Sequence, residues 1–312
     1  MIDQANVIVD EDVAVPLPPA VAEQERPTRV RDVVGALSSG SAIVGVVLVL
    51  IVLVLAIGAP FLSLHDPQAI DIKNKAAPPI FLSGGTWDHP LGTDGLGRDL
   101  WARIVYGLRT SLVISVLAVT LAVAVGLTVG IVAGYFGGVA ESILMRITDV
   151  QMAFPFIILA IAILSVTQPG PLVLVLVLSL STWPLYARVI RTMVIVDSGS
   201  DYVLVAKAMG ASHWRVIRRY LMRNLLLGVA IMSTLDIATI IVLEALLGFI
   251  GLGIQPPTPS LGNIMADGRS YLSLGQWWIT TLPGVAILVT LLGLNLMGDS
   301  LQSKLDPRLR RT

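Results

Sequence analysis

The chain has 312 residues, of which 55% are hydrophobic and 13% are charged, and its 21 Lys and Arg balance 21 Asp and Glu. So low a charged fraction excludes an ordinary soluble domain, in which about 25% of residues are charged, and predicts an integral membrane protein. The zero net charge gives no indication of nucleic-acid binding, and the absence of cysteine excludes a disulfide framework.

Charge-free runs predict six transmembrane helices, since a spanning helix needs about 20 consecutive apolar residues. We expect them at residues 41–64, 110–140, 141–167, 172–190, 224–250 and 277–298. The break between the third and fourth helices is placed at Gln168-Pro169-Gly170-Pro171, because the charge-free stretch 150–187 is too long for one helix. The predicted fold class is therefore an all-α integral membrane protein with six spans.

The rest of the chain divides around these helices. Residues 1–40 are a polar tail expected to be disordered, and residues 65–109 are expected to form a loop and a surface helix. Residues 110–303 form a five-helix core that contains two long connections, 200–223 and 251–276, and residues 304–312 form a short tail. If the N-terminus is inside, 15 of the 21 Lys and Arg are cytoplasmic, so the positive-inside rule places both termini in the cytoplasm.

Loop 65–109 contains three closely spaced glycines, Gly92, Gly95 and Gly97. They make unusual backbone angles available, and Asp99 can cap a helix that begins near Leu100. That helix, which carries Arg103 and Arg109, is expected on the outer surface before the chain turns inward. Taken alone, these residues indicate a structural turn of the chain rather than a site that contacts substrate.

The connection 200–223 has a helical pattern. Four apolar residues recur at i, i+3, i+4 and i+7 from Tyr202, namely Tyr202, Val205, Ala206 and Met209. Gly210 can take the left-handed conformation that ends this short helix, and Ser212 can cap the next one. In the second helix an apolar stripe lies opposite a basic one. The apolar stripe is Trp214, Ile217 and Leu221, and the basic one is Arg215, Arg218 and Arg219.

This pattern leaves two interpretations of the connection open. It is either an interfacial element that anchors the loop on the membrane, or a docking element for a cytoplasmic partner. Small residues would allow a partner to approach closely; they are Ala206, Ala208, Gly210 and Ala211. A DNA-binding helix-turn-helix is disfavoured, because the segment lies between two spans.

Two acids, Asp236 and Glu244, lie within the fifth predicted span, where acidic side chains are costly and usually face a bundle interior or a water-filled path. Their spacing of eight residues separates them by about 80° around a helix, so both could border one cavity. They are candidates for a translocation path, where they would meet a substrate ammonium group. In the alternative interpretation, Glu244 is solvated near the outer end or one acid pairs with an arginine.

The outer connection 251–276 contains Gln255-Pro256-Pro257-Thr258-Pro259, and three prolines in five residues predict a rigid extended loop. Such rigidity suits a binding surface for a partner and a purely structural connection equally well.

Motifs for catalysis are missing. No glycine is followed by lysine, so the chain has no phosphate-binding P-loop and is not expected to hydrolyse ATP itself. The three histidines, His65, His89 and His213, fall in three separate loops without H-x-x-x-H spacing, and no G-x-S-x-G occurs. We therefore predict no catalytic residue and no metal site.

Segment 204–223 resembles the conserved cytoplasmic loop of ABC-importer permeases, whose consensus is roughly Glu-Ala-Ala, three residues, then Gly. The matching residues are Ala206, Lys207, Ala208, Met209, Gly210 and Ala211. The sequence departs from the consensus at Leu204 and Val205, in the Glu and first Ala places, and at Arg223, in a Pro place. These departures concern the detailed docking contacts.

Three further segments are similar to the C-type permease subunit of dipeptide and oligopeptide importers. They are His89-Pro90-Leu91-Gly92-Thr93-Asp94 and its continuation to Leu112, residues 247–262 including Gln255-Pro256-Pro257, and Leu305-Asp306-Pro307-Arg308-Leu309-Arg310. The resemblance covers about residues 41–310. It implies a type I ABC importer permease fold with a cytoplasmic coupling helix.

The resemblance also implies roles for particular residues. The loop that couples to the ATPases would consist of Val205, Ala206, Lys207, Ala208, Gly210, Ala211, Ser212, Trp214 and Arg215. The outer surface that meets a partner would consist of Gly92, Asp94, Gly97, Arg98, Asp99, Gln255, Pro256 and Pro257.

The family resemblance implies that the chain forms half of a translocation pore in the bacterial inner membrane. Its partners would be a homologous permease subunit in a heterodimer, two cytoplasmic ATPases that bind ATP and Mg²⁺, and an extracytoplasmic substrate-binding protein. Di- or oligopeptides are the expected cargo, and nickel or glutathione is the alternative. A proton-coupled secondary transporter that uses Asp236 and Glu244 is a further alternative.

Overall fold

A computed structural model of the chain describes residues 40–168 and 170–305. All regular structure within these ranges is helical, apart from an isolated antiparallel bridge between Thr93 and Asp99. The two predicted tails lie outside these ranges except at Gly40, Lys304 and Leu305, which are helical. The all-α fold class expected from the sequence is confirmed.

The elements, in chain order, are α2 (Gly40–Ile57), α3 (Ala59–Leu62), η1 (Ile72–Asn74), α4 (Leu100–Phe136), α5 (Gly138–Ala153), α6 (Phe156–Val166), α7 (Pro171–Ser198), α8 (Asp201–Ala208), α9 (His213–Val216), η2 (Ile217–Leu221), α10 (Met222–Phe249), α11 (Leu261–Gly268), η3 (Arg269–Leu274) and α12 (Trp278–Leu305). Of the short elements, η1 and η3 are 3-10 helices and η2 is a π-helix.

Five helical segments are long and apolar enough to span a membrane: Gly40–Ile57, Leu100–Phe136, Pro171–Ser198, His213–Phe249 and Trp278–Gln302. The fourth of these runs without a break from α9 through η2 into α10. Helices α5 and α6 together supply a sixth candidate, but they meet at an angle of 86°. Six spans are therefore obtained when this bent pair counts as one.

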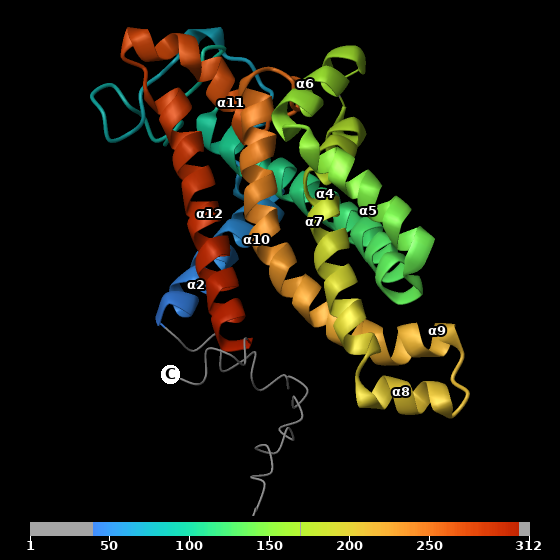
Figure 1. Cartoon of the computed structure of the whole chain (residues 1–312). Helices are drawn as coiled ribbons and strands as arrows, with labels where there is room; N and C mark the ends of the chain where they lie inside the picture. Colours follow the sequence, from blue (N-terminus) through green and yellow to red (C-terminus); the bar gives the residue numbers. More distant parts are fainter. Residues whose placement is uncertain (1–39, 169, 306–312) are drawn as a thin grey trace, which may run out of the picture.

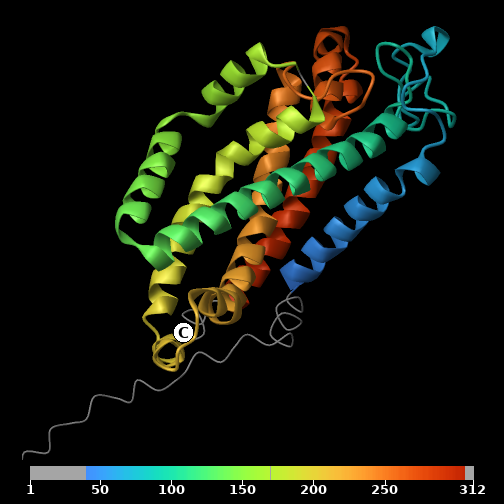
Figure 2. The same cartoon turned by 90° about the vertical axis from the view of Figure 1, so that its right-hand side faces the viewer.

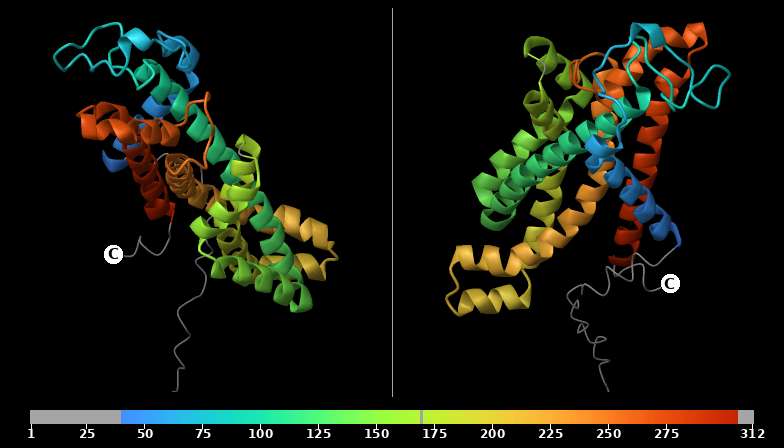
Figure 3. Two further views of the ribbon diagram at one scale, coloured as in Figure 1. Left: turned by 90° about the horizontal axis from the view of Figure 1, so that it is seen from above. Right: turned by 180° about the vertical axis from the view of Figure 1, so that it is seen from behind.

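The long helices α4, α7, α10 and α12 form the body of the molecule, and α2 packs along α12 and α4 (Figure 1, Figure 2). The antiparallel pair α8 and α9, here called the hairpin, projects from one end, which we call the hairpin end. Seen from behind, it extends away from the bundle (Figure 3). The opposite end, the loop end, carries α11, η3 and the segment between α3 and α4. Helix α2 begins and α12 ends at the hairpin end (Figure 1).

Helix α4 differs from the prediction, because it is one continuous helix where a surface helix and a separate span beginning at residue 110 were expected. Its first turn starts at Leu100, with Asp99 as the N-cap whose carboxylate accepts a hydrogen bond from the Ala102 N–H at 2.8 Å. The predicted cap is thus confirmed. Arg103 does not hold the helix at the surface, because its side chain is buried against acidic partners described below.

The third predicted span is broken, whereas the fourth is longer than expected. Pro155 separates α5 from α6, and the preceding Phe154 is extended, with φ −90° and ψ 128°. Proline lacks an N–H and disfavours a helical conformation for the residue before it, so the helix ends here. Helix α7 continues past the predicted end at residue 190 to Ser198, because Arg188 and Arg191 limit an apolar run without ending a helix.

The most extensive helix contact in the described part of the chain joins α4 to α7. Gly126, Gly130 and Gly134 recur at every fourth position of α4 along this contact. A Cβ added at Gly126 would lie 2.4 Å from the Cβ of Tyr186, and one at Gly130 would lie 2.7 Å from the Ala187 carbonyl oxygen. Small residues at this spacing let the backbones of membrane helices approach closely.

Gly130→Leu is expected to destabilise the chain by about 1–3 kcal/mol, since the larger side chain must push α7 away. Thermal unfolding of the purified protein measures the loss. Ala124→Leu, at an exposed position of the same helix, is the control and should leave the unfolding temperature nearly unchanged. Equal unfolding temperatures for the two variants would contradict the close contact.

Candidate functional site

The corner of the hairpin is Gly210, which has a φ of +82°. The Gly210 N–H donates to the Lys207 carbonyl oxygen and the Ala211 N–H donates to that of Ala206, both at 3.0 Å. A Cβ at Gly210 would meet nothing within 4 Å, so glycine is favoured here by backbone conformation rather than by space. The predicted end of the first helix at Gly210 is confirmed.

The inner face of the hairpin packs on its own chain. Val203 and Ala206 of α8 are buried. Val203 belongs to a hydrophobic cluster that also contains Val194 of α7 and Val216 of α9. The hairpin is therefore held in place by apolar contacts with the bundle.

The outer face of α8 is apolar and exposed. The exposed fractions are 44% for Tyr202, 57% for Val205 and 83% for Met209. The predicted apolar stripe is thus divided, since Ala206 alone of its four members faces inward. Large apolar side chains gathered on an exposed surface are typical of an interaction site.

The helical segment after the corner, α9 and the following η2, also differs from the prediction. Ile217 and Leu221 are buried, whereas Trp214 is 69% exposed and does not share their face. Ser212 is the N-cap residue of α9, but its side chain makes no capping hydrogen bond. The predicted position of the cap is correct and the predicted hydrogen bond is wrong.

Two contacts that sequence reasoning missed tie the hairpin to α4. The Tyr135 hydroxyl lies 2.9 Å from Nδ1 of His213, within hydrogen-bond distance. The Lys207 ammonium lies 5.1 Å from the centre of the Tyr135 ring, in the range of a cation–π interaction. Tyr135 stands at the end of a long apolar helix, where no local pattern marks it.

The remaining residues predicted to couple to a partner lie around the corner. Most are exposed: Lys207, Ala208, Gly210, Ser212 and Arg215. Ala211 is half-buried. The hairpin thus presents apolar and basic side chains together on one projecting element.

Asp236 lies partway along α10, half-buried against α7. Its Oδ2 atom is buried and has no hydrogen-bond partner in the described part of the chain. The Tyr186 hydroxyl interacts with the Asp236 carboxylate and donates to Ser233 Oγ at 3.3 Å. A carboxylate with an unused acceptor atom can receive a further donor.

Glu244 is fully buried, unlike Asp236. Its Oε2 accepts a hydrogen bond from Ser111 of α4 at 2.7 Å, so it links α4 to α10. The alternative of a solvated Glu244 is wrong. The two acids therefore differ in burial, since Asp236 is half-buried and Glu244 is fully enclosed.

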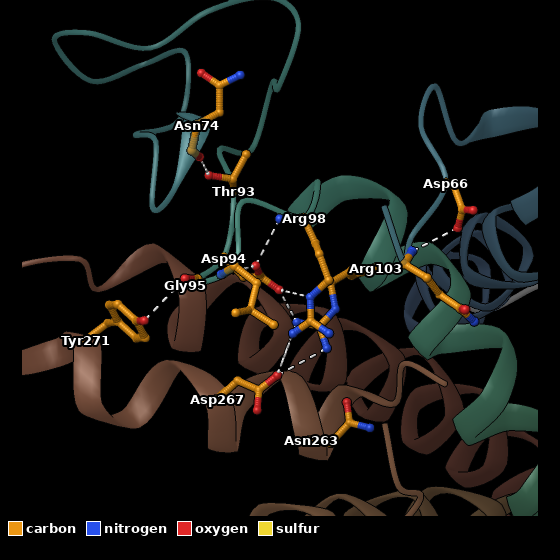
Figure 4. Close-up of polar contacts among 12 residues, drawn as sticks. Asp66, Asn74, Thr93, Asp94, Gly95, Arg98, Arg103, Asn263, Asp267 and Tyr271 are labelled. Carbon is orange, nitrogen blue, oxygen red and sulfur yellow. Dashed lines mark hydrogen bonds and ion pairs between the residues drawn. The ribbon is translucent and has the colours of Figure 1, made fainter. Parts of the chain in front are cut away.

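A cluster of four ionic side chains lies at the loop end (Figure 4). Arg98 Nε donates to Asp94 Oδ2 at 2.7 Å, and Arg103 also donates to this oxygen. Both arginines reach Asp267 of α11, Arg98 at 3.0 Å and Arg103 at 3.2 Å. Two positive and two negative groups thereby neutralise one another where loop 63–99, α4 and α11 meet.

Burial corrects the prediction of a partner surface in this segment. Gly92, Asp94, Gly97, Arg98 and Asp99 are all buried. They form the interior of the loop end, because the ionic cluster and the cap of α4 draw them inward. The interpretation as a structural turn of the chain describes their placement.

Gly97 lets this loop close on itself. It has a φ of +77°, and a Cβ there would lie 1.7 Å from the Asp71 carbonyl oxygen. Asp71 caps η1, and hydrogen bonds from the Asn74 side chain and the Lys73 N–H lower the pKa of its carboxyl. Residues 71–74 are therefore fixed against the segment that leads into α4.

Gln255, Pro256 and Pro257 remain exposed. The loop that carries them is held by Asn263, whose side-chain amide donates to the carbonyl oxygens of Ile254 at 3.0 Å and Thr258 at 2.9 Å. This part of the predicted outer surface is accessible and anchored.

The fold and these sites define a multi-span helical membrane protein with a projecting hairpin at one end and an ordered loop region at the other. Residues 126–311 match the family model described as "Binding-protein-dependent transport system inner membrane component". The chain belongs to this family.

Curated relatives support the same assignment. The dipeptide transport system permease protein DppC of Escherichia coli K12 is 39% identical over 272 residues, covering 86% of this chain and 90% of the relative. The probable D,D-dipeptide transport system permease protein DdpC of the same organism is 36% identical, covering 84% and 86%. The di/tripeptide permease DppC of Pseudomonas aeruginosa is 35% identical, covering 86% and 88%.

Among solved structures, the chain is similar to one from the MetNI methionine ABC transporter in an inward-facing conformation. The TM-score is 0.52 at 20% identity, and the match covers 65% of this chain and 96% of that chain. This likeness shows a shared fold.

Asp94→Asn is expected to lower the free energy of unfolding by about 3–5 kcal/mol, because it leaves two buried arginines with one acidic partner. Thermal unfolding of the purified chain checks this. Asp267→Asn is the comparison, and it should be milder because the Asp267 side chain is 39% exposed. A loss for Asp94→Asn no larger than that for Asp267→Asn would contradict the central role of Asp94.

Proposed function

We propose that the chain is one of two homologous permease subunits that together form the pore of an ATP-driven peptide importer. The chain contains no P-loop, so two partner ATPases would bind ATP and Mg²⁺ and supply the energy. An extracytoplasmic binding protein would deliver the cargo. The names of the relatives support di- or oligopeptides as that cargo.

The observation that carries this proposal is the exposed outer face of the hairpin. Tyr202, Val205, Met209 and Trp214 expose between 44% and 83% of their surface although the inner face is firmly packed. An apolar face on a fixed element loses little conformational freedom on binding, which favours docking. We infer that the ATPases dock here.

Charge supports a cytoplasmic position for the hairpin end. Lys207 and three arginines, Arg215, Arg218 and Arg219, are exposed on or beside the hairpin. Basic residues near membrane spans concentrate on the cytoplasmic side. The loop end would then face outward, with Gln255, Pro256 and Pro257 available to the binding protein.

Asp236 is the residue that we place on the translocation path. A peptide carries an N-terminal ammonium group, which the half-buried Asp236 carboxylate would meet on the path. Glu244 is assigned a structural role, since it is buried and bonded to Ser111.

Val205→Asp and Met209→Asp are each expected to lower the recovery of ATPases about tenfold, because a carboxylate would be desolvated in the docked interface. The chain is tagged in its native membrane and purified in mild detergent, and stoichiometric partners are identified by mass spectrometry. Gln68→Asp adds the same charge at an exposed position of the loop end and should change nothing. If the recovery of ATPases is unchanged in both variants, docking on this face is contradicted and the membrane-anchor interpretation is favoured.

Asp236→Asn is expected to reduce peptide uptake in intact cells about tenfold, by removing the charge that meets the ammonium group. Thermal unfolding should change little. Glu244→Gln is the matched comparison and should affect stability more than uptake. Normal uptake kinetics for Asp236→Asn would remove this residue from the path.

A further inference from the structure

Two histidines that are distant in sequence meet at the loop end. His65 follows α3 and His89 precedes α4, yet their ring centres lie 4.8 Å apart. Together with Asp99 they offer potential metal-ligand atoms that all lie within 4.8 Å of one another. The fold thus brings together two of the three histidines across the segment between α3 and α4.

Asp99 fixes the orientation of the His89 ring. Its Oδ1 lies 3.0 Å from His89 Nδ1, and its Oδ2 is held by the Ala102 N–H at 2.8 Å. An ionised carboxylate only accepts, so Nδ1 carries a proton, and in the neutral ring Nε2 presents a lone pair. Carboxylates hold the ligating histidines of metal sites in this way.

The Nε2 atom of each ring faces the same carboxylate, that of Asp88. His65 Nε2 lies 3.6 Å from Asp88 Oδ1, and His89 Nε2 lies 3.8 Å from Asp88 Oδ2. Both separations are too long for hydrogen bonds. Two ligands of a tetrahedral ion with bonds of about 2.0–2.2 Å stand roughly 3.3–3.6 Å apart, so a small inward movement would complete such a site.

One further observation indicates an unsatisfied polar group at this place. His65 Nδ1, the ring nitrogen that is not the proposed ligand, is buried and has no hydrogen-bond partner in the described part of the chain. A buried polar atom left unpaired in this way indicates an ordered water or an ion. The His89 side chain is 8% exposed, and its Nε2 lies 3.8 Å from Asp88.

We propose that His65, His89 and Asp88 bind a divalent transition-metal ion of the Zn²⁺ class, with Asp99 as the positioning residue. Two imidazoles and one carboxylate form a ligand set that suits Zn²⁺, and water would complete the tetrahedron. The ion would tie the end of α3 to the start of α4 and so close loop 63–99. The site uses neither the hairpin nor Asp236. The metal-binding proposal can therefore be tested independently of the proposed transport role.

The test uses the full chain with whatever subunits accompany it, purified through a tag that contains no histidine. After treatment with a chelator, the protein is dialysed against Zn²⁺ and the bound metal is counted by mass spectrometry. His65→Ala and Asp88→Asn are the variants, because their side chains are 35% and 71% exposed and their loss leaves the core intact. Asp66→Asn is the control, since Asp66 is exposed beside His65 and its side chain only accepts from the Gln68 N–H.

The wild type and Asp66→Asn should each bind one ion per chain, and both test variants should bind at least about tenfold more weakly. Zn²⁺ should also raise the unfolding temperature of the wild type and not that of His65→Ala, because the ion binds only the folded loop. The proposal is overturned if the wild type binds no stoichiometric Zn²⁺. Binding that survives in His65→Ala and Asp88→Asn would equally overturn it and would point to His213 at the opposite end.

Discussion

The close contact between α4 and α7 is the constraint on which the other features depend. Lipid supplies no hydrogen bonds and no hydrophobic force between helices, so membrane helices associate through close packing of small residues. Gly126 and Gly130 permit that approach. Helix α7 then leads directly into the hairpin, and α4 carries Ser111, which holds Glu244 of α10. One helix pair therefore positions the hairpin and braces the helix that bears Asp236.

The two ends of the bundle hold their charged groups in different ways. At the loop end, Asp94 and Arg103 are buried and neutralised within the chain, and Asn263 fixes the neighbouring loop. At the hairpin end, apolar side chains such as Met209 remain uncovered. Apolar side chains are also uncovered at the loop end, such as Trp87 and Leu274, so the two ends differ in how they hold their charges rather than in apolar exposure.

Features that depend on neighbouring residues are predictable from the sequence, and those that depend on distant segments are not. Apolar runs locate the spans, and Gly210 marks the corner of the hairpin. Helical spacing shows that α8 has two faces but not that Val205 points outward, because the bundle decides which face is covered. Nothing near Arg103 indicates Asp267, so its burial could not be predicted. Pro155 is a local signal, but the long charge-free run around it favours a single helix.

Helices α9, η2 and α10 form one helical run from His213 to Phe249. The π-helix η2 contains about one extra residue per turn, which shifts the helical phase by roughly 100° and separates Trp214 from the face of Leu221. From Trp214 to Asp236 the backbone path is about 30 Å at 1.5 Å per residue. The hairpin is therefore joined to the middle of the bundle by the backbone of a single helical run.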